Sequence, residues 1–481
     1  MKPVYHELHA RSALSFLRGA SLPEQLCAAA AKEGVPSLAV CDRNGLFGAP
    51  RAYGTGKATG VRPIVGCEIV MEDASVVPLL VTSRAGYKAL CRTLTRAALR
   101  APKGEARTTW RELEECRGGV IALTGDTEGP LARPIETEDR NAADAIVKKL
   151  VDALGKEAIY IELQRHRQRD DVRRGEALVE IARAHDLPLV ATNGVTYADP
   201  DFAEVQDVFT SILHHTNLDK AGRLLGANRE RHVKSAKEMA GLFADLPEVI
   251  ENTQRIVDQV GFTLENLGYA FPEFPVPAGE TMTSYLRAQT DAGAVGRYGT
   301  ITPKIRSQLD RELKLISELG FCGYFLAVWD IVQFARSQGI LVQGRGSAAN
   351  SAVCYSLGIT SVDPIAGRLL FERFLSEGRT SWPDIDLDFP AGDRRETVIQ
   401  EIYRRHPGSA MTANVIRFKG KSCMRELGKA LGFTNDVIDR FSSLFASGDF
   451  KHTIEVEEQI VRAGVPRSHP RFDATRRLYQ K

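Results

Sequence analysis

The sequence predicts an α/β protein of several domains, of which the first is barrel-like. Short apolar strands at residues 37–41, 159–163 and 187–192 alternate with amphipathic helices at residues 24–33 and 171–185. Polar turns precede the strands, and this alternation is typical of a sheet that is covered by helices. The length of 481 residues fits about three domains, each large enough for its own core.

The clearest domain boundary is the proline-rich run FPEFPVP at residues 271–277, which predicts a stiff, extended linker. We therefore expect four successive parts. They are a first domain at residues 1–265, a linker at 266–279, a second domain at 280–421 and a helical part at 422–481.

Two helical patterns follow the linker. Thr302-Pro303 starts a helix that ends at Gly320, and an apolar stripe along it predicts packing against a core. The stripe consists of Ile305, Leu309, Leu313 and Ile316. From about Ser422 the pattern is again helical, and its expected buried positions are Leu427, Leu431, Val437 and Phe441.

The composition argues against several classes of protein. The net charge of +2 is close to neutral, so nucleic-acid binding would depend on a local basic face. The eight cysteines stand singly and form no CxxC pair, which indicates reduced core residues of a cytoplasmic protein. There is no N-terminal signal segment and no apolar run of about 18 residues, which argues against secretion and membrane spanning.

The most informative segment is WPDIDLDF at residues 382–389, in which Asp384, Asp386 and Asp388 alternate with apolar residues. Side chains two positions apart in a strand lie on one face, about 6.6 Å from each other. That face can therefore hold divalent cations. The opposite face points to the core and consists of Ile385, Leu387 and Phe389. A solvated acidic loop is the plainer alternative, but cations explain the apolar opposite face better, because buried unpaired carboxylates are costly.

A glycine-rich turn lies upstream of the acidic segment. An apolar strand at residues 339–343 enters the turn GRGS at residues 344–347, and a helix of small residues leaves it through residues 352–357. Glycines let the backbone approach a ligand, and free N–H groups at a helix start bind phosphate. Arg345 adds a fixed positive charge, so the turn predicts a phosphate-binding site.

The same turn leaves a rival interpretation open. Gly344, Gly346 and Ala349 also satisfy the dinucleotide fingerprint, which would make the protein a nicotinamide- or flavin-dependent enzyme. Such a unit should open a domain and carry an acid at the end of its second strand. Here the turn lies deep in the chain, and the nearest acid, Asp363, stands before Pro364.

A phosphate-binding turn followed by an acidic strand indicates a nucleotidyl transferase. Two cations on the carboxylates would activate an attacking hydroxyl and bridge a triphosphate. Between the motifs, Arg373 would contact a phosphate or pair with a neighbouring acid. The chain then becomes basic, which suits a nucleic-acid backbone, although surface helices are often as charged. The basic residues are Arg394, Arg395, Arg404, Arg405, Arg417, Lys419, Lys421 and Arg425.

Three motifs resemble, in order and spacing, the palm domain of bacterial C-family DNA polymerases of the DNA polymerase III alpha-subunit type. They are GRGS at residues 344–347, LFERFL at 370–375 and PDIDLDF at 383–389. The variant AANSAVCY at residues 348–355 is similar to the error-prone, damage-tolerant branch of that family. The resemblance runs from about Tyr5 to the last residue. It implies an incomplete palm at residues 280–421 and part of a helical thumb at 422–481.

The resemblance implies roles for particular residues. Asp386 and Asp388 match the two catalytic aspartates that bind Mg²⁺, and Asp384 matches a supporting residue. The positions implied for nucleotide binding are Gly344, Arg345, Gly346, Ser347 and Arg373.

The family adds deoxynucleotides to a primer on a DNA template. Its members continue with a third catalytic aspartate, fingers, and clamp-binding and nucleic-acid-binding domains. The implied partners are primer-template DNA, deoxynucleoside triphosphates and, through those further regions, a sliding clamp and damage-tolerance accessory proteins, all in the cytoplasm and without a membrane. Because the chain stops inside the part that resembles the thumb, we expect residues 1–481 to be inactive alone. A non-catalytic fragment that binds DNA or a partner is the alternative.

The N-terminal part resembles a polymerase-and-histidinol-phosphatase (PHP) domain, which in complete members holds up to three metal ions in a cluster of histidines and acids. Five motifs carry this resemblance. They are YHELHARS at residues 5–12, DRNGLFG at 42–48, GCE at 66–68, QRH at 164–166 and ATNGVTY at 191–197.

The metal cluster that the resemblance implies is incomplete. Arginines or other residues replace expected ligands at Arg11, Arg43, Val76, Gly194 and Thr196. The remaining positions are His9, Asp42, Glu68 and His166. An arginine stays charged and cannot ligate a metal, so Arg11 and Arg43 would repel cations while pairing with the leftover acids. We therefore expect a scaffold without phosphoesterase activity, in which His166 is a hydrogen-bonded core histidine. A single residual metal ion is the alternative.

Overall fold

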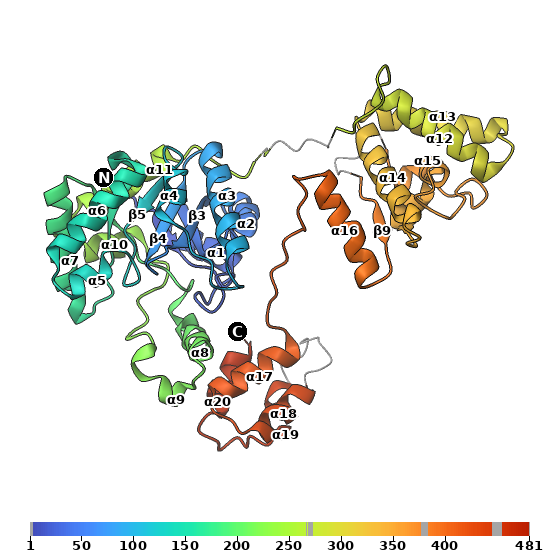
Figure 1. Cartoon of the computed structure of the whole chain (residues 1–481). Coiled ribbons are helices and arrows are strands. Elements are labelled where there is room, and N and C mark those ends of the chain that lie inside the picture. Colours follow the sequence, from blue (N-terminus) through green and yellow to red (C-terminus); the bar gives the residue numbers. More distant parts are fainter. Residues whose placement is uncertain (1–2, 266, 268–272, 377–382, 445–454, 481) are drawn as a thin grey trace. The chain divides into compact units, whose positions relative to one another are not determined.

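The computed structural model describes residues 3–265, 267, 273–376, 383–444 and 455–480. It divides the chain into two compact units (Figure 1). The first unit combines Met1–Glu265 with Val415–Lys481, and the second is Asn266–Asn414. Trp382 of the acidic segment and Phe271 and Pro272 of the linker lie outside the described residues.

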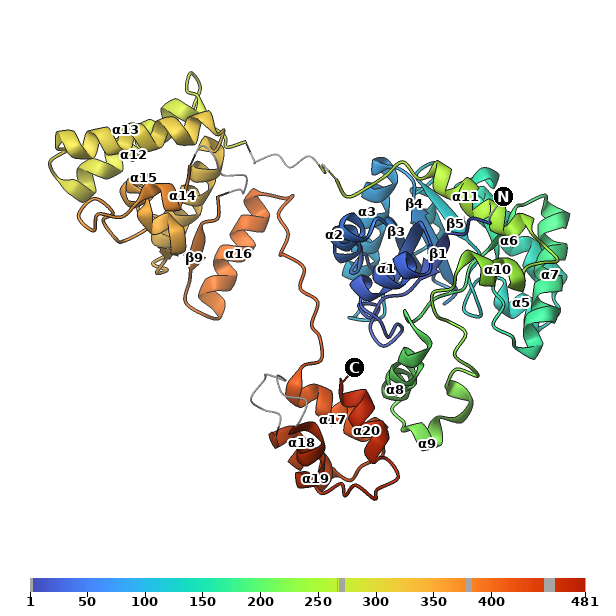
Figure 2. The ribbon, with the colours of Figure 1, turned by 180° about the vertical axis from the view of Figure 1, so that it is seen from behind.

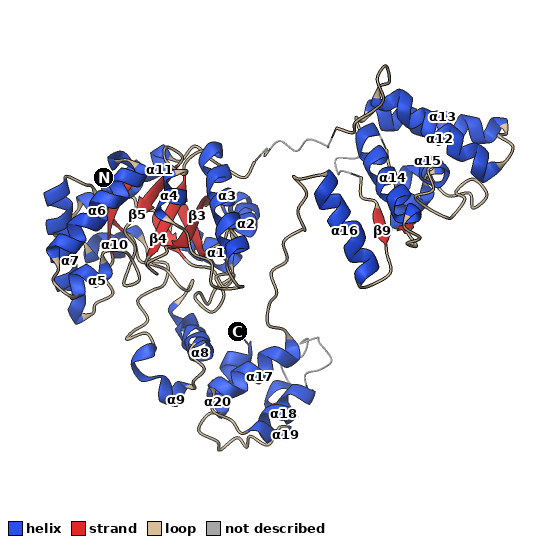
Figure 3. Cartoon of the chain, viewed as in Figure 1, coloured by secondary structure: helices blue, strands red, loops and turns tan. Residues whose placement is uncertain are grey.

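A seven-stranded sheet forms the centre of the first unit, and its strands follow one another in chain order (Figure 3). They are β1 (Glu7–Ala10), β2 (Ser37–Arg43), β3 (Arg62–Val70), β4 (Val76–Val81), β5 (Val120–Leu123), β6 (Ile159–Leu163) and β7 (Leu189–Ala191). Neighbours are parallel, except that β4 is antiparallel to β3 and β5. Ala10 also forms a parallel bridge with Val195, beyond β7. The predicted β/α barrel is therefore a curled, incomplete barrel that contains one antiparallel strand.

Helices cover this sheet (Figure 2). They are α1 (Pro23–Lys32), α2 (Ala49–Thr59), α3 (Arg84–Arg100), α4 (Trp110–Glu114), α5 (Ala132–Glu136), α6 (Arg140–Leu154), α7 (Arg169–His185), α10 (Ala236–Leu242) and α11 (Glu248–Gln259). The predicted helices at residues 24–33 and 171–185 correspond to α1 and α7 and are confirmed within two residues at each end. A strand that is buried on both faces has a continuous apolar sequence. This is why the sequence predicts β2 and β6.

The C-terminal helices pack on the first unit. They are α17 (Gly420–Ala430), α18 (Asn435–Leu444), α19 (Glu455–Arg462) and α20 (Phe472–Gln480). Their buried side chains share one cluster with Val208 of α8 (Ala203–Leu213), next to α9 (Leu218–Ala221). Leu427, Leu431 and Phe441 are buried there as predicted, and Val437 is partly buried. The sequence predicts helices after the second domain but no partner for them, and the division into palm and thumb stays a prediction.

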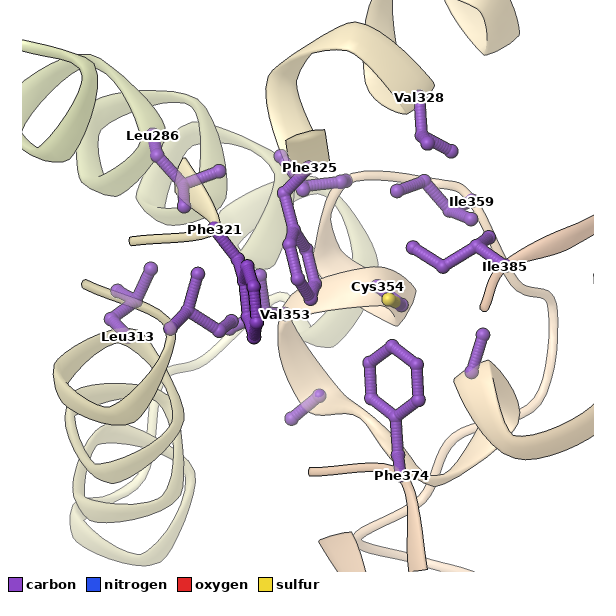
Figure 4. Close-up of a cluster of buried hydrophobic side chains, with 14 of the residues drawn as sticks. Leu286, Leu313, Phe321, Phe325, Val328, Val353, Cys354, Ile359, Phe374 and Ile385 are labelled. Atoms are coloured by element: carbon purple, nitrogen blue, oxygen red, sulfur yellow. The ribbon is translucent and has the colours of Figure 1, made fainter. Parts of the chain in front are cut away.

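The second unit consists of helices around a main apolar core (Figure 4), and a smaller apolar cluster contains Ala335, Ile340 and Val398. The helices are α12 (Met282–Tyr298), α13 (Pro303–Glu318), α14 (Cys322–Ser337), α15 (Ala352–Ser356) and α16 (Asp393–Arg405). The stripe predicted on α13 is confirmed, because Ile305, Leu309, Leu313 and Ile316 are all buried. No single described helix is long and apolar enough to cross a membrane, and α13 with α14 passes that test only as a pair bent by 115°.

The two strands of this unit, β8 (Gln343–Arg345) and β9 (Asp386–Asp388), form an antiparallel pair. The strand predicted at residues 339–343 is wrong in position, since it starts at Gln343 and Leu341 is 77% exposed. A dinucleotide-binding unit needs parallel strands joined by a crossover helix. Within the described part of this unit the antiparallel pair is the sheet, so the dinucleotide interpretation has no structural support.

Candidate functional site

The glycine-rich turn and the acidic segment are neighbouring strands. Arg345 pairs in register with Asp386, and Gln343 with Asp388. The amide of Ile385, just before β9, donates to the hydroxyl of Tyr324 on α14 at 3.1 Å. This pairing brings residues that are about forty positions apart in the sequence into one site.

The two faces of the acidic segment differ as the alternation predicts. Asp384, Asp386 and Asp388 are exposed. Ile385 is 9% exposed in the core of the second unit, and Leu387 packs against the same core. An extended backbone separates the two sets because successive side chains point to opposite faces. The three carboxylates therefore reach solvent from a strand that is anchored by its apolar side.

The turn comes very close to the acidic strand. Gly346 has a φ of +69°, and a Cβ there would lie 3.5 Å from Oδ2 of Asp386. At Gly344 a Cβ would lie 2.5 Å from the carbonyl oxygen of Ile359, so only glycine fits without displacement of the backbone. The Nε of Arg345 lies 3.2 Å from Oδ2 of Asp388, and these side chains are 68% and 51% exposed. An ion pair this exposed contributes little stability and can exchange partners.

Arg373 ends a short turn, Phe371–Arg373, which lies next to the Gly346–Asn350 turn. Its side chain is exposed, while the adjacent Glu372 pairs with Arg311. Gly344, Arg345, Gly346 and Ser347 thus lie in or directly after β8, and Arg373 lies in a turn that contacts the Gly346–Asn350 turn.

The donor set fits Mg²⁺. This ion prefers oxygen ligands and is usually held by one or two carboxylates together with water and substrate phosphates. Asp386 and Asp388 supply such oxygens on an exposed strand. The described residues contain no cluster of three or more histidine, cysteine or acidic side chains suited to a metal ion, so substrate oxygens would have to complete the shell.

One part of the predicted phosphate site is closed. The sequence predicts free N–H groups at the start of the helix that follows the turn. In the structure the amides of Ala352 and Val353 donate to the Glu312 carboxylate at 3.0 and 3.1 Å, and Cys354 donates to Oγ of Ser351 at 3.1 Å. These amides are therefore not open to a phosphate, and the predicted site reduces to the turn itself. The apolar stripe of α13 gives no sign of this role for Glu312, although Glu312 is next to Leu313 of that stripe.

A second charged cluster occupies the first unit, where the PHP resemblance implies metal ligands. Glu68 is fully buried and accepts from Nε of Arg11 at 2.5 Å, Nε of Arg43 at 2.6 Å and Nε2 of His9 at 2.8 Å. The two arginines thus pair with a leftover acid, as expected. Burial alone would raise the pKa of Glu68, but Arg11, His9 and Arg43 outweigh it and lower the pKa far below its usual range.

His9 connects two buried acids. Its Nε2 faces Glu68, and its Nδ1 lies 2.7 Å from Oε1 of Glu162. Burial would lower the pKa of His9, but Glu162 and Glu68 outweigh it and raise the pKa to about 10. Both ring nitrogens are therefore already engaged by buried carboxylates in this structure.

The remaining PHP positions have separate structural contacts. Asp42 accepts from the amide of Ser12 at 2.9 Å and of Gly48 at 2.7 Å, and burial raises its pKa to about 6. His166 lies 2.9 Å through Nε2 from the carbonyl of Asn193, and burial lowers its pKa to about 3. These contacts fix loops around the sheet. His166 is buried and hydrogen-bonded, and its assignment as a core histidine instead of a metal ligand stays a prediction.

Several members of this cluster were not recognised in the sequence. Arg11 also pairs with Asp126 at 2.8 Å, and Arg43 pairs with Glu128 at 2.7 Å. Arg231 lies 3.5 Å from Asp126. Glu162 was detectable as the charged residue in the apolar strand β6, whereas the others lie in loops that follow no periodic pattern.

Comparison with known proteins matches both units. Residues 284–478 match the family profile described as bacterial DNA polymerase III alpha NTPase domain, and residues 7–166 match the PHP domain. The error-prone DNA polymerase of Caulobacter vibrioides is 39% identical over 439 residues, which are 90% of this chain and 40% of the relative. That of Pseudomonas savastanoi pv. phaseolicola is 40% identical over 454 residues, with 93% and 42% covered.

The chain spans about 40% of the length of these relatives. Among solved structures, an amidohydrolase from Chromobacterium violaceum aligns with 40% of this chain at 14% identity and a TM-score of 0.30, and 88% of that structure is covered. With both profiles matched in order and relatives near 40% identity over nine-tenths of the sequence, the chain belongs to the bacterial DNA polymerase III alpha family of the type that carries a PHP domain.

Proposed function

We propose that this chain supplies the nucleotide-addition site of an error-prone DNA-directed DNA polymerase, which extends a primer by nucleotidyl transfer and tolerates damaged templates. One observation carries the proposal. The β8–β9 pair sets the exposed carboxylates of Asp386 and Asp388 beside the glycine turn that would hold a triphosphate. Because the chain spans about 40% of its relatives, the complete reaction needs further regions of such a polymerase.

The proposed roles follow from chemistry and position. Asp386 and Asp388 hold Mg²⁺, and Asp384 supports them from the same face. When bound, Mg²⁺ neutralises phosphate charge and favours ionisation of the attacking hydroxyl. Gly346 lets the triphosphate approach the backbone, and Ser347 binds it beside that glycine. Gly344 supports the turn by its close packing against the backbone of Ile359. Arg345 exchanges its contact with Asp388 for a phosphate, which frees that carboxylate, and Arg373 binds phosphate from the edge.

The PHP unit acts as a scaffold without phosphoesterase activity in this proposal. Protonated His9 and the charged guanidinium groups of Arg11 and Arg43 already satisfy Glu68, so a divalent cation would have to displace cations that belong to the protein. Metal analysis of the purified protein should find no stoichiometric zinc or manganese. Manganese-stimulated trimming of DNA 3′ ends that disappears in His9→Ala would contradict this assignment.

The partners of the proposed enzyme are primer-template DNA and deoxynucleoside triphosphates in the cytoplasm. A sliding clamp and damage-tolerance accessory proteins would bind through regions that the relatives carry beyond the matched part.

A chimera tests the polymerase proposal. In it, residues 1–481 replace the matched region of the Caulobacter vibrioides polymerase, and Mg²⁺-dependent primer extension is measured. We expect extension, and we expect Asp386→Asn and Asp388→Asn each to reduce it by about a hundredfold or more. Asp393→Asn, an exposed acid at the start of α16, is the matched control and should leave the rate unchanged. An Asp386→Asn chimera as fast as its parent would refute the assignment.

A further inference from the structure

Glu312 is a buried acid without a cationic partner. It lies on α13 with 0% exposure, and no described lysine, arginine or histidine forms an ion pair with it. An isolated carboxylate is costly to bury unless hydrogen-bond donors surround it. The hydrogen-bond donors around Glu312 therefore indicate the structural role of this side chain.

Four donors surround the Glu312 carboxylate. Oε1 accepts from the amide of Ala352 at 3.0 Å and from Nε2 of Gln308 at 2.8 Å. Oε2 accepts from Oγ of Ser351 at 2.7 Å and from the amide of Val353 at 3.1 Å. Three of these four donors belong to consecutive residues at the start of α15, so one side chain of α13 fixes that helix start.

The same contacts continue into the glycine turn. The amide of Ser351 donates to the carbonyl of Ala348 at 3.1 Å, and Nδ2 of Asn350 donates to the carbonyl of Ser347 at 2.9 Å. Ser347 follows Gly346, which lies against Asp386. A continuous path of hydrogen bonds and backbone therefore runs from Glu312 to the proposed triphosphate site.

The far end of α15 is fixed by packing. A Cβ on Gly293 of α12 would lie 2.0 Å from the carbonyl oxygen of Ser356, so the two backbones are in direct contact. Val353 and Cys354 lie in the same apolar core as Ile385, which anchors the acidic strand (Figure 4). With this end held by apolar contacts, Glu312 is the polar group that sets the position of the end facing the turn.

We propose that Glu312 is a positioning residue for nucleotide binding: its carboxylate occupies the start of α15, fixes Ser351, and so holds Gly346 and Ser347 beside Asp386. This role rests on the proposed polymerase function. It has two consequences for the substrate. The turn is held in one geometry before nucleotide binds. The Glu312 carboxylate already occupies the amides of the α15 start, so the triphosphate must bind at residues 344–347.

Two measurements on the polypeptide of residues 1–481 test the role. The first is amide hydrogen exchange over residues 346–354. The second is the Mg²⁺-dependent affinity for the fluorescent nucleotide mant-dATP. The test variants are Glu312→Gln, which turns an amide NH₂ toward the donors, and Ser351→Ala, which removes one donor and is milder if the first variant does not fold. Glu318→Gln, an exposed acid on the same helix, is the matched control.

We expect exchange of the Ala352 and Val353 amides to accelerate by about tenfold or more in Glu312→Gln, because a buried donor loses its acceptor. The affinity for mant-dATP should fall by about tenfold, while exchange in α12 and α14 is unchanged. Glu318→Gln should match the wild type in both measurements.

The two ideas fail differently. If the wild type binds mant-dATP and neither Glu312→Gln nor Ser351→Ala weakens binding, the positioning role is overturned and the polymerase proposal stands. If the wild type and Asp386→Asn show the same absence of Mg²⁺-dependent binding, the nucleotide site itself is overturned, and the role of Glu312 with it. Faster exchange spread over the whole second unit, with unchanged affinity in Ser351→Ala, would mean a general structural role and would also overturn the inference.

Discussion

Glu68 is held by three cationic side chains although it is fully buried. In a metal-binding domain the corresponding carboxylate would meet a divalent cation. Here the side chains of His9, Arg11 and Arg43 supply the positive charge, and they do so with or without metal ions. A mutation that removes the Glu68 carboxylate should therefore lower the free energy of unfolding.

The substitution Glu68→Gln should destabilise the first unit by about 3–5 kcal/mol, because it leaves buried cations without their common acceptor. Urea denaturation followed by circular dichroism measures this change. Glu24→Gln is the control, since Glu24 pairs with Arg51 at 2.6 Å on the surface, where such a pair contributes less than about 1 kcal/mol. Equal losses in the two variants would contradict the importance of the buried cluster.

The titration of His9 gives a pH dependence with a definite sign. Its pKa is raised to about 10 in the folded protein, above the value of about 6.5 expected in the unfolded chain. The contribution of His9 to stability is therefore complete below about pH 6.5 and is lost as the pH rises toward 10. We expect the free energy of unfolding to fall more steeply over this interval in the wild type than in His9→Gln. Parallel curves for the wild type and His9→Gln would show that His9 is not protonated in the folded state.

At the scale of elements, the close approach of α12 and α15 gives a paired prediction. Gly293→Ala places a Cβ 2.0 Å from the carbonyl oxygen of Ser356, whereas Gly296, three residues later, faces open space. We expect Gly293→Ala to destabilise the second unit by about 1–3 kcal/mol through overpacking. Gly296→Ala should stabilise the same helix by up to about 1 kcal/mol, because glycine is a poor helix former. Urea denaturation of both variants measures these changes, and destabilisation of equal size would refute the packing argument.

The elements also show where sequence periodicity is informative. The stripe on α13 and the alternation of β9 were predictable, because a regular element buries one face and repeats with a fixed period. The position of β8 was not, since the apolar run before it includes the exposed Leu341. The closed start of α15 depends on Glu312 from another helix, and such a tertiary hydrogen bond leaves no local pattern.

At the scale of the whole molecule, residues 1–481 contain Asp386 and Asp388 but only about 40% of the length of the relatives. We predict at most weak, salt-sensitive DNA binding and no template-directed synthesis by this polypeptide alone, because misplacement of reacting groups by about 1 Å can cost a hundredfold in rate. Primer extension and DNA binding at two salt concentrations measure both properties. Extension by residues 1–481 that is abolished by Asp386→Asn would show that another acid completes the site, with Asp363 and Glu372 as the nearest candidates in the sequence.

The arrangement of whole segments was the least predictable level. The sequence indicated that residues beyond Ser422 are helical and which of them are buried, but it did not indicate that they pack against α8. The reason is physical: an amphipathic helix defines its apolar face but not the partner that covers it. Charged contacts, such as Arg477 with Glu204 at 3.3 Å, add to this pairing, and surface charges of this kind carry no local signal.

The packing of α17 on α8 also sets an order of events during protein synthesis. Val208 and Met424 meet in one buried cluster although more than 200 residues separate them in the chain. A ribosome adds about 5–20 residues per second, so the helices that cover the apolar side of α8 are synthesised roughly 10–40 s after α8 itself. During that interval the nascent chain presents Val208, Phe209 and Ile212 to chaperones, and to the same side chains of neighbouring nascent chains on the polysome.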